Sequence, residues 1–256
     1  MRLLFLLAVL LAGPARAETL CPEQFFGGEP PALVNPRLGV GARALCFEAF
    51  AVLHSAATRT PLYSAERLTA ERIRAARETP RDSSFHAEPA LPEDEQAELF
   101  DYARSGWDRG HLAPSGDMPN DAAQQESFSL ANIIPQAPQL NRNLWEGMES
   151  AIRTLAVRRG ELYVVTGPIF GGAELRALNG RVIIPTEVFK AVLDPRRHQA
   201  GAYVATNDND PSWRVVSMAE LQRLTGLDVF PTLPAQAKLS ALRLPAPTPT
   251  ARHFRR

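Results

Sequence analysis

A helical spacing of apolar residues is the clearest pattern in the chain. It covers residues 140–158, where four apolar side chains recur at intervals of four, four and three: Leu144, Met148, Ile152 and Leu155. Positions at these intervals lie on one face of an α-helix, which can pack against a core. Gly160 follows directly and predicts the end of this helix, because glycine readily adopts the left-handed conformation found at helix C-termini.

Shorter patterns predict strands and further helices around this central helix. Runs rich in β-branched and aromatic residues predict four strands: residues 44–53, 161–166, 181–193 and 201–205. Stretches that mix charged and apolar residues predict three helices: residues 64–77, 95–103 and 218–224. Residues 79–94 are polar and interrupted by prolines, so a loop is expected there. The chain should therefore fold as an α+β domain, with a central mixed or antiparallel sheet flanked by helices.

The N-terminus has the composition of a targeting segment. Met1 and Arg2 precede an unbroken apolar run, and Ala15-Arg16-Ala17 offers the small residues that a signal peptidase recognises. We therefore expect residues 1–17 to be a signal peptide, with an uncleaved anchor as the alternative. An apolar run of about ten residues is too short for a bilayer, which needs roughly 20, so no membrane span is expected in the mature chain. The protein would then be exported, either to a periplasm or out of the cell.

The remaining residues divide into three parts by composition. Residues 18–43 begin rich in glycine and proline and are expected to be irregular, whereas residues 44–240 are expected to form the folded domain. Residues 241–256 combine prolines with a basic end, which favours a disordered tail.

Charge and cysteine content narrow the range of functions. The sequence has 28 basic and 28 acidic residues, and the predicted signal peptide contains two arginines and no acid, which leaves the mature chain a formal charge of about −2. No overall positive field attracts it to nucleic acid, so any phosphate binding has to be local. The two cysteines, Cys21 and Cys46, predict one disulfide in an oxidising compartment and are too few for a common structural zinc site.

The densest group of reactive residues is the sequence Asp108-Arg109-Gly110-His111. An imidazole titrates near neutral pH, so His111 is a candidate base that takes a proton from water. Arg109 offers a planar guanidinium that can bind a phosphate oxygen or offset developing negative charge. Taken alone, these residues could equally form hydrogen bonds on an ordinary turn.

A second group of polar residues lies in and before the predicted central helix. Asn132 begins the sequence Asn-Ile-Ile-Pro-Gln, and Asn141, Trp145 and Glu149 are spaced by four, so they share a helix face. Asn141 and Glu149 lie about 12 Å apart along the helix axis, which suits a direct ligand and a water-mediated one for a single ion. An amide oxygen with waters suits Mg²⁺. The alternatives are a helix N-cap for Asn141, a solvated position for Glu149 and a core contact for Trp145.

Together these motifs resemble those of the DNA/RNA non-specific endonucleases. The similarity consists of Asp-Arg-Gly-His, then Asn-Ile-x-Pro-Gln, then Leu-Asn-x-x-x-Trp-x-x-x-Glu, and it continues through Val-Val-Thr-Gly-Pro-Ile at residues 164–169. It covers residues 44–235, and the ordered set is far more specific than any single motif. The resemblance implies a ββα-metal (His-Me finger) active site, as in secreted bacterial nucleases and endonuclease G.

The resemblance also implies a role for each of the polar residues. His111 would deprotonate the attacking water, and Asn141 would be the one direct protein ligand of a Mg²⁺ ion, for which Mn²⁺ could substitute. Glu149 would act through the water ligands of the ion, Arg109 would contact the phosphate, and Asn132 would position the site.

The family has a further catalytic arginine upstream of these motifs. Arg81 resembles it best, although the loop spacing leaves Arg77 and Arg74 as alternatives. The implied activity is a Mg-dependent endonuclease that contacts the backbone of DNA and RNA, has little sequence preference and leaves 5′-phosphate and 3′-hydroxyl ends. The alternatives are a catalytically weak nucleic-acid-binding member of the fold and a phosphodiesterase for small diesters. Some relatives pair, so the resemblance allows a homodimer.

Overall fold

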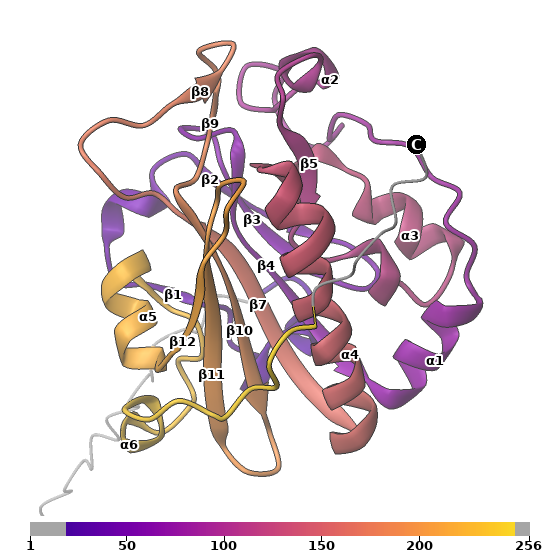
Figure 1. The fold of residues 1–256 in the computed structure, drawn as a ribbon, viewed down its shortest axis with the longest axis vertical. Coiled ribbons are helices and arrows are strands. Elements are labelled where there is room, and N and C mark those ends of the chain that lie inside the picture. The colour runs from indigo at the N-terminus through magenta and orange to yellow at the C-terminus, as the bar shows by residue number, and fades with distance from the viewer. Residues whose placement is uncertain (1–18, 249–256) are drawn as a thin grey trace, which may run out of the picture.

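A seven-stranded sheet, in the order β12-β11-β10-β7-β4-β3-β2, forms the centre of the fold (Figure 1). The computed structural model describes residues 19–248, so the predicted signal peptide lies outside the described residues. The strands are β2 (Ala42–Cys46), β3 (Ala51–Ser55), β4 (Thr60–Thr69), β7 (Glu161–Ile169), β10 (Glu187–Asp194), β11 (Gln199–Thr206) and β12 (Trp213–Val216). Every neighbouring pair in this sheet is antiparallel, which confirms the predicted α+β class with a central sheet.

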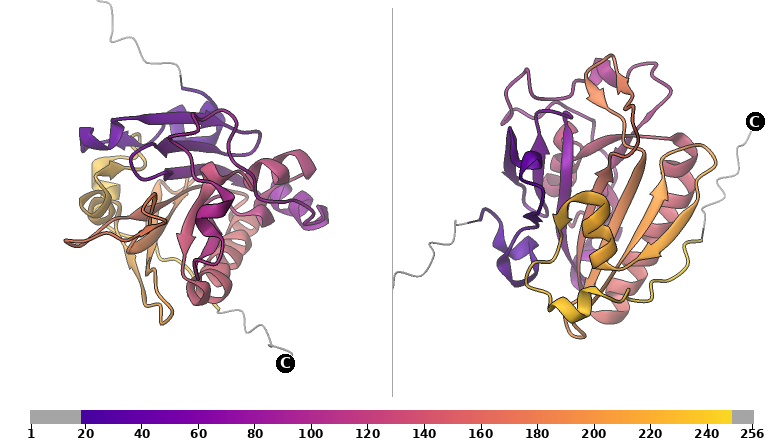
Figure 2. Two further views of the ribbon diagram at one scale, coloured as in Figure 1. Left: turned by 90° about the horizontal axis from the view of Figure 1, so that it is seen from above. Right: turned by 90° about the vertical axis from the view of Figure 1, so that its left-hand side faces the viewer.

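The sheet separates two hydrophobic cores. Along β7, Val164 belongs to the core under α4 (Glu146–Arg159), whereas Val165 belongs to the core under α5 (Met218–Thr225). Successive side chains of a strand point to opposite faces, so one strand supplies both cores. Figures 1 and 2 show α4 and α5 on opposite faces of the sheet.

The central helix agrees with its prediction except in its first turns. Residues Leu140–Trp145 form a π-helical stretch, η6, that continues directly into α4. Gly160 ends the helix with a φ of 88°, as predicted. Met148 and Ile152 are buried against the sheet, so the apolar spacing identified the packed face correctly. π-helical turns are uncommon and frequently occur at functional sites.

Two segments that were each predicted as a single element form two elements in the structure. The expected helix over residues 64–77 is wrong for its first half, because β4 runs to Thr69 and pairs with both β3 and β7. Only α1 (Ala70–Glu78) is helical, and the Thr69 side chain caps it by accepting from the Arg72 N–H. The expected strand over residues 44–53 is a hairpin, because the Phe47 N–H donates to the Phe50 carbonyl and turns the chain between β2 and β3.

Other predictions hold over part of their length. Residues 181–193 contain β9 (Val182–Ile183) and β10, separated at Pro185, which has no N–H to donate to a ladder. The helix expected over residues 95–103 is the single turn α2 (Leu99–Tyr102), whereas α5 and β11 match closely. The remaining α-helices and strands are α3 (Asp121–Ser127), α6 (Ala235–Lys238), β1 (Ala32–Leu33), β5 (Asp108–His111), β6 (Ile133–Gln136), β8 (Ala177–Leu178) and β13 (Leu227–Asp228). No helix among residues 19–248 has the length and apolar character needed to cross a bilayer.

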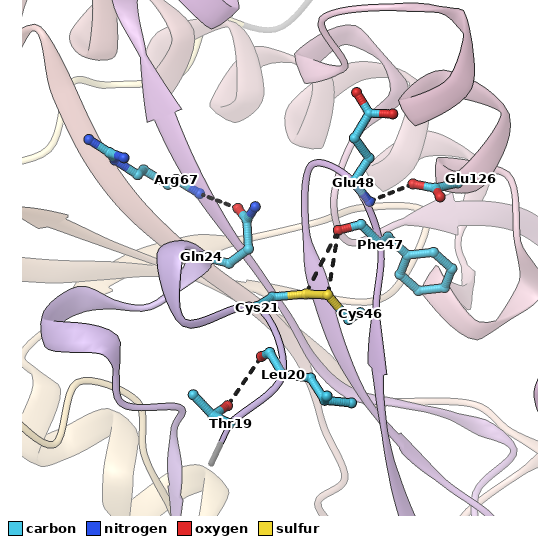
Figure 3. Close-up of a disulfide and its surroundings, with 9 residues drawn as sticks. All are labelled: Thr19, Leu20, Cys21, Gln24, Cys46, Phe47, Glu48, Arg67 and Glu126. Atoms are coloured by element: carbon cyan, nitrogen blue, oxygen red, sulfur yellow. Dashed lines mark hydrogen bonds between the residues drawn. A yellow bond between two sulfur atoms is a disulfide. The ribbon is translucent and has the colours of Figure 1, made fainter.

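Both ends of the described chain are attached to the sheet. The predicted disulfide joins Cys21 to Cys46 of β2, and Figure 3 shows it beside the hydrogen bond that the Arg67 N–H donates to Gln24. At the other end, residues 241–248 are not the disordered tail that the sequence suggested. The Leu242 N–H donates to the Ala200 carbonyl at 2.7 Å, and Leu244 is buried. The rest of the expected tail, residues 249–256, lies outside the described residues.

Candidate active site

Two short strands and the central helix form a ββα unit. β5 and β6 pair antiparallel, with Arg109 opposite Pro135 and His111 opposite Ile133, and the helix begins a few residues later. Gly110 is required between Arg109 and His111, because a Cβ at this position would lie 2.6 Å from the Cβ of Gln136. Arg109 and His111 are two apart, so both side chains leave the same face of the strand.

An open cavity of about 870 Å³ lies over this unit. It is lined by five of the six residues that the sequence suggested for the site: Arg81, Arg109, His111, Asn141 and Glu149. The sixth, Asn132, lies beneath the cavity and is fully buried. Arg81 comes from the loop after α1, whereas neither Arg74 nor Arg77 contributes to the lining, which favours Arg81 among the three candidates.

His111 is held between aromatic rings. Its ring centroid lies 5.2 Å from that of Phe85 and 4.9 Å from that of Phe128, and its Nε2 is buried without a hydrogen-bond partner among the described residues. Burial, together with a smaller effect of the positive charge of Arg81, lowers the pKa of His111 to about 3. The imidazole is therefore neutral at neutral pH and able to accept a proton. An anionic phosphate bound nearby would raise this pKa again.

Asn132 organises the backbone that follows His111. Its Oδ1 accepts from the Ser64 hydroxyl at 2.8 Å and from the Ala113 N–H at 3.0 Å. Its amide nitrogen donates to the carbonyls of Ala113 and Ser127. The amide is thus fully used inside the protein, so Asn132 contributes by positioning the loop after β5 and does not face the cavity.

Asn141 is oriented by a carboxylate. Its amide nitrogen donates to Asp108 at 2.9 Å, which fixes the orientation of the side chain, because only the nitrogen of an amide can donate to a carboxylate. Its Oδ1 accepts no hydrogen bond from the described residues. Arg142 binds both oxygens of the same carboxylate. Burial raises the pKa of Asp108, but the hydrogen bonds from Arg142 and Asn141 outweigh it and hold that pKa below its usual range. Asn141 lies inside the helix, so it is not an N-cap.

Glu149 lies deeper in the cavity, and its side chain is 13% exposed. Burial raises the pKa of its carboxyl to about 7, although the positive charges of Lys190 and Arg153 act in the opposite direction. Arg153 lies one turn further along α4, 4.0 Å from Glu149, and donates to Asp117 at 3.0 Å. A divalent cation or its bound water would favour the ionised form of Glu149.

A buried charge network supports the site from below. Its members are three acids and three bases: Glu66, Asp117, Glu149, Arg72, Arg153 and Lys190. Lys190 is 1% exposed and donates to the carbonyl of Leu112, directly after His111, and to the Thr166 hydroxyl. Arg72 pairs with the buried Glu66 at 3.0 Å. The network ties β4, β10 and α4 to the loop that follows His111.

Comparison with known proteins identifies the family. Residues 30–236, most of the chain, match the family described as DNA/RNA non-specific endonuclease. The chain belongs to this family. It is therefore a nuclease, and the resemblance seen in its motifs is confirmed.

The chain is similar to nucleases from other organisms. Nuclease C1 of Cunninghamella echinulata var. echinulata is 30% identical over 206 residues, which cover 73% of this chain and 82% of that protein. The mitochondrial nuclease EXOG of Danio rerio is 33% identical over 199 residues, which cover 70% of this chain and 58% of that longer protein. A chain in the crystal structure of the EndoG/EndoGI complex superposes with a TM-score of 0.70 and 25% identity, over 77% of this chain and 89% of the other.

The donors of the nuclease fit a sparsely ligated, hydrated ion. No cluster of three or more His, Cys, Asp or Glu residues that could cage a metal occurs among residues 19–248. The oriented Oδ1 of Asn141 and the carboxylate of Glu149, in an open polar cavity, instead suit an ion that keeps most of its water shell, as Mg²⁺ does. The residues present therefore fit the metal that the family requires.

Some residues of the nuclease site were not assigned a role from the sequence. Arg153 follows Glu149 by four residues, so helical spacing alone could have placed it on the same face. Asp108 belongs to the Asp-Arg-Gly-His motif, but its contact with Arg142 forms only in the folded protein, where β5 lies beside the helix. Lys190 gave no local signal, because its partners lie on other strands and loops.

Proposed function

We propose that the protein is an exported, Mg²⁺-dependent endonuclease that hydrolyses DNA and RNA with little sequence preference. The observation that supports this most directly is the convergence of a neutral imidazole, an oriented amide oxygen, a buried carboxylate and two arginines in one cavity. A phosphodiester needs a base for the attacking water, positive charge for the phosphate and help for the leaving oxygen. This set of side chains can supply the first two requirements.

The residues divide the work as follows. His111 accepts the proton of the attacking water, while Arg81 and Arg109 hold the non-bridging phosphate oxygens. Asn141 would hold Mg²⁺ through Oδ1, and Glu149 would orient its water ligands. When bound, Mg²⁺ neutralises charge on the phosphate and supplies an acidic water near the leaving 3′ oxygen. Cleavage in this sense leaves a 5′-phosphate and a 3′-hydroxyl, and contacts limited to the backbone give little sequence preference.

Export is proposed on two separate grounds. The N-terminal sequence has the charged, apolar and small-residue order of a signal peptide. The Cys21–Cys46 disulfide is the kind of bond that persists in an oxidising compartment. Relatives such as nuclease EXOG of Danio rerio and nuclease 1 of Schizosaccharomyces pombe are described as mitochondrial, whereas the N-terminal pattern and the disulfide of this chain favour export.

The proposal is tested by digesting plasmid DNA and RNA with the purified protein, with Mg²⁺ and with EDTA. Wild type should cut both polymers only with metal. His111→Ala should cut 10²- to 10⁴-fold more slowly, roughly the contribution of a general base. Asn141→Ala should need a higher Mg²⁺ concentration for half-maximal activity. His198→Ala, an exposed histidine outside the cavity, is the matched control.

Four results would contradict this function. Undiminished cleavage by His111→Ala would exclude the proposed base, and equal cleavage in EDTA would exclude the metal. A folded wild-type protein that binds nucleic acid but cuts neither polymer would be the catalytically weak form. Cleavage of bis(p-nitrophenyl) phosphate without cleavage of either polymer would indicate a phosphodiesterase for small diesters.

A further inference from the structure

Four arginine–aromatic pairs lie at and beside the cavity. By the distance from guanidinium carbon to ring centroid, they are Arg81–Phe128 (5.6 Å), Arg109–Phe85 (4.5 Å), Arg176–Trp107 (5.9 Å) and Arg181–Phe100 (5.1 Å). The proposed reaction uses Arg81 and Arg109. The other two arginines flank the short strands β8 and β9, so the hairpin of residues 176–183 places guanidinium groups over two rings that belong to other segments.

The hairpin is continuous with the active site. Trp107 lines the cavity and packs against a hydrophobic cluster that contains Leu178 and Val182 of the hairpin and Tyr102 of α2. Asn179 of the hairpin donates its side-chain amide to the carbonyl of Phe100 in α2. Figure 1 and the right-hand view of Figure 2 show the hairpin and α2 together at one end of the molecule. The hairpin and α2 therefore adjoin the cavity at Tyr102 and Trp107, which both line it.

This surface is unusually apolar for an exposed position. Phe100 is 56% exposed, and Leu99 and Leu175 are each 44% exposed. These are three of only eight large hydrophobic side chains that are exposed among residues 19–248. Arg176 is also exposed, whereas Arg181 is partly buried and pairs with Asp101 at 3.2 Å. One exposed ring and two exposed leucines therefore occur together with cations beside the cavity.

We infer that the hairpin of residues 176–183 and α2 form a binding surface for the unpaired bases of a single-stranded segment of the substrate. The inference rests on the proposed nuclease function and specifies the form of nucleic acid that this part of the site takes. Unpaired bases stack on aromatic rings and on guanidinium planes, and the same arginines bind the intervening phosphates. A duplex keeps its bases stacked inside the helix, so it can use the arginines but not the exposed Phe100 ring.

The test measures binding of fluorescent 12-nucleotide single strands and of the matching duplex in Mg²⁺, by anisotropy. It uses the His111→Ala protein, so that the probes stay intact. Phe100→Ala and Arg176→Ala are compared in that background with Trp213→Ala and Arg37→Ala, an exposed tryptophan and an exposed arginine outside the cavity lining. Thermal unfolding checks that each variant remains folded.

Phe100→Ala should weaken single-strand binding by roughly tenfold, in the range found for base–aromatic stacking, with duplex binding changed less than twofold. Arg176→Ala should also lower the slope of log affinity for single strands against log salt concentration, by an amount that corresponds to about one phosphate contact. Phe100→Ala should leave this slope unchanged. Both control variants should bind like the parent.

The inference is overturned if Phe100→Ala binds single strands as the parent does, which would leave this apolar surface to a protein partner. It is also overturned if single-strand and duplex binding fall equally, because the surface would then only add positive charge. Failure of the proposed function is distinct, since it appears as the absence of plasmid and RNA cleavage by the wild type.

Discussion

At the scale of single residues, His111 couples the active site to the stability of the protein. Its ring is surrounded by Phe85 and Phe128 and lies in the positive field of Arg81, which together keep it unprotonated. In the unfolded chain the same imidazole is exposed and titrates near its ordinary pKa of 6.5. Because the unfolded state binds a proton more readily, acid favours unfolding through this residue.

The free energy of unfolding should therefore fall as pH decreases from 6.5 toward 3, and remain constant above 6.5 as far as His111 is concerned. Between pH 7.5 and pH 5, the free energy of unfolding of the wild type should fall by about 2 kcal/mol more than that of His111→Asn. This follows from about 1.4 kcal/mol per pH unit, applied from the unfolded pKa of 6.5 down to pH 5. Urea unfolding of both proteins at the two pH values measures this difference. Parallel losses in the two proteins would show that the folded pKa of His111 is not depressed.

The residues that face the cavity could be identified from the sequence because they lie within short, ordered motifs. His111, Arg109 and Asn141 each sit in such a motif, and all three line the cavity. The residues that hold them could not be identified in this way. Lys190 reaches the carbonyl of Leu112 across 78 positions of sequence, and such a contact exists only once the sheet has formed.

At the scale of elements, the close approach of β5 and β6 makes Gly110 a sensitive position. A methyl group there would meet the side chain of Gln136, which is fully buried and cannot swing into solvent. The two strands would have to separate, and Arg109 and His111 would move with β5.

Gly110→Ala should lower the free energy of unfolding by about 1–3 kcal/mol, as expected for an overpacked site, and should reduce cleavage more than stability alone explains. Thermal unfolding and plasmid cleavage at 25 °C measure the two effects. Gly171→Ala is the matched control, because a Cβ there meets only the Thr186 hydroxyl at 3.4 Å. Equal behaviour of the two variants would refute the argument from strand separation.

Elements with a strong internal pattern were predicted well, and those decided by distant pairing were not. The helix over residues 140–158 and the strand β7 follow from local periodicity and composition. β4 mixes charged and apolar residues in a way that also fits a helix, and its strand form depends on pairing with β3 and β7. The ββα unit could not be predicted for the same reason, because β5 has no strand pattern of its own and is a strand only through its pairing with β6.

At the scale of the whole molecule, the disulfide fixes the N-terminal segment to the edge of the sheet. It closes a separation of 25 residues between Cys21 and Cys46, which on the chain-entropy model stabilises the protein by roughly 3 kcal/mol. The double variant Cys21→Ser, Cys46→Ser should therefore unfold at lower urea concentration and still cleave plasmid at 25 °C, because neither residue lines the cavity. Wild type treated with reductant should unfold like the variant. Unchanged midpoints in both would show that the bond contributes nothing.

The buried charge network also restricts how this nuclease can diverge. Within it Arg153 pairs with the buried Asp117, and removing either partner alone leaves the other charge in the interior without that counterion, at a cost of roughly 3–5 kcal/mol. A relative can lose such a pair only when the acid and the base are both replaced. In related sequences, substitutions at these positions should therefore occur in pairs, whereas exposed arginines elsewhere should be replaced singly.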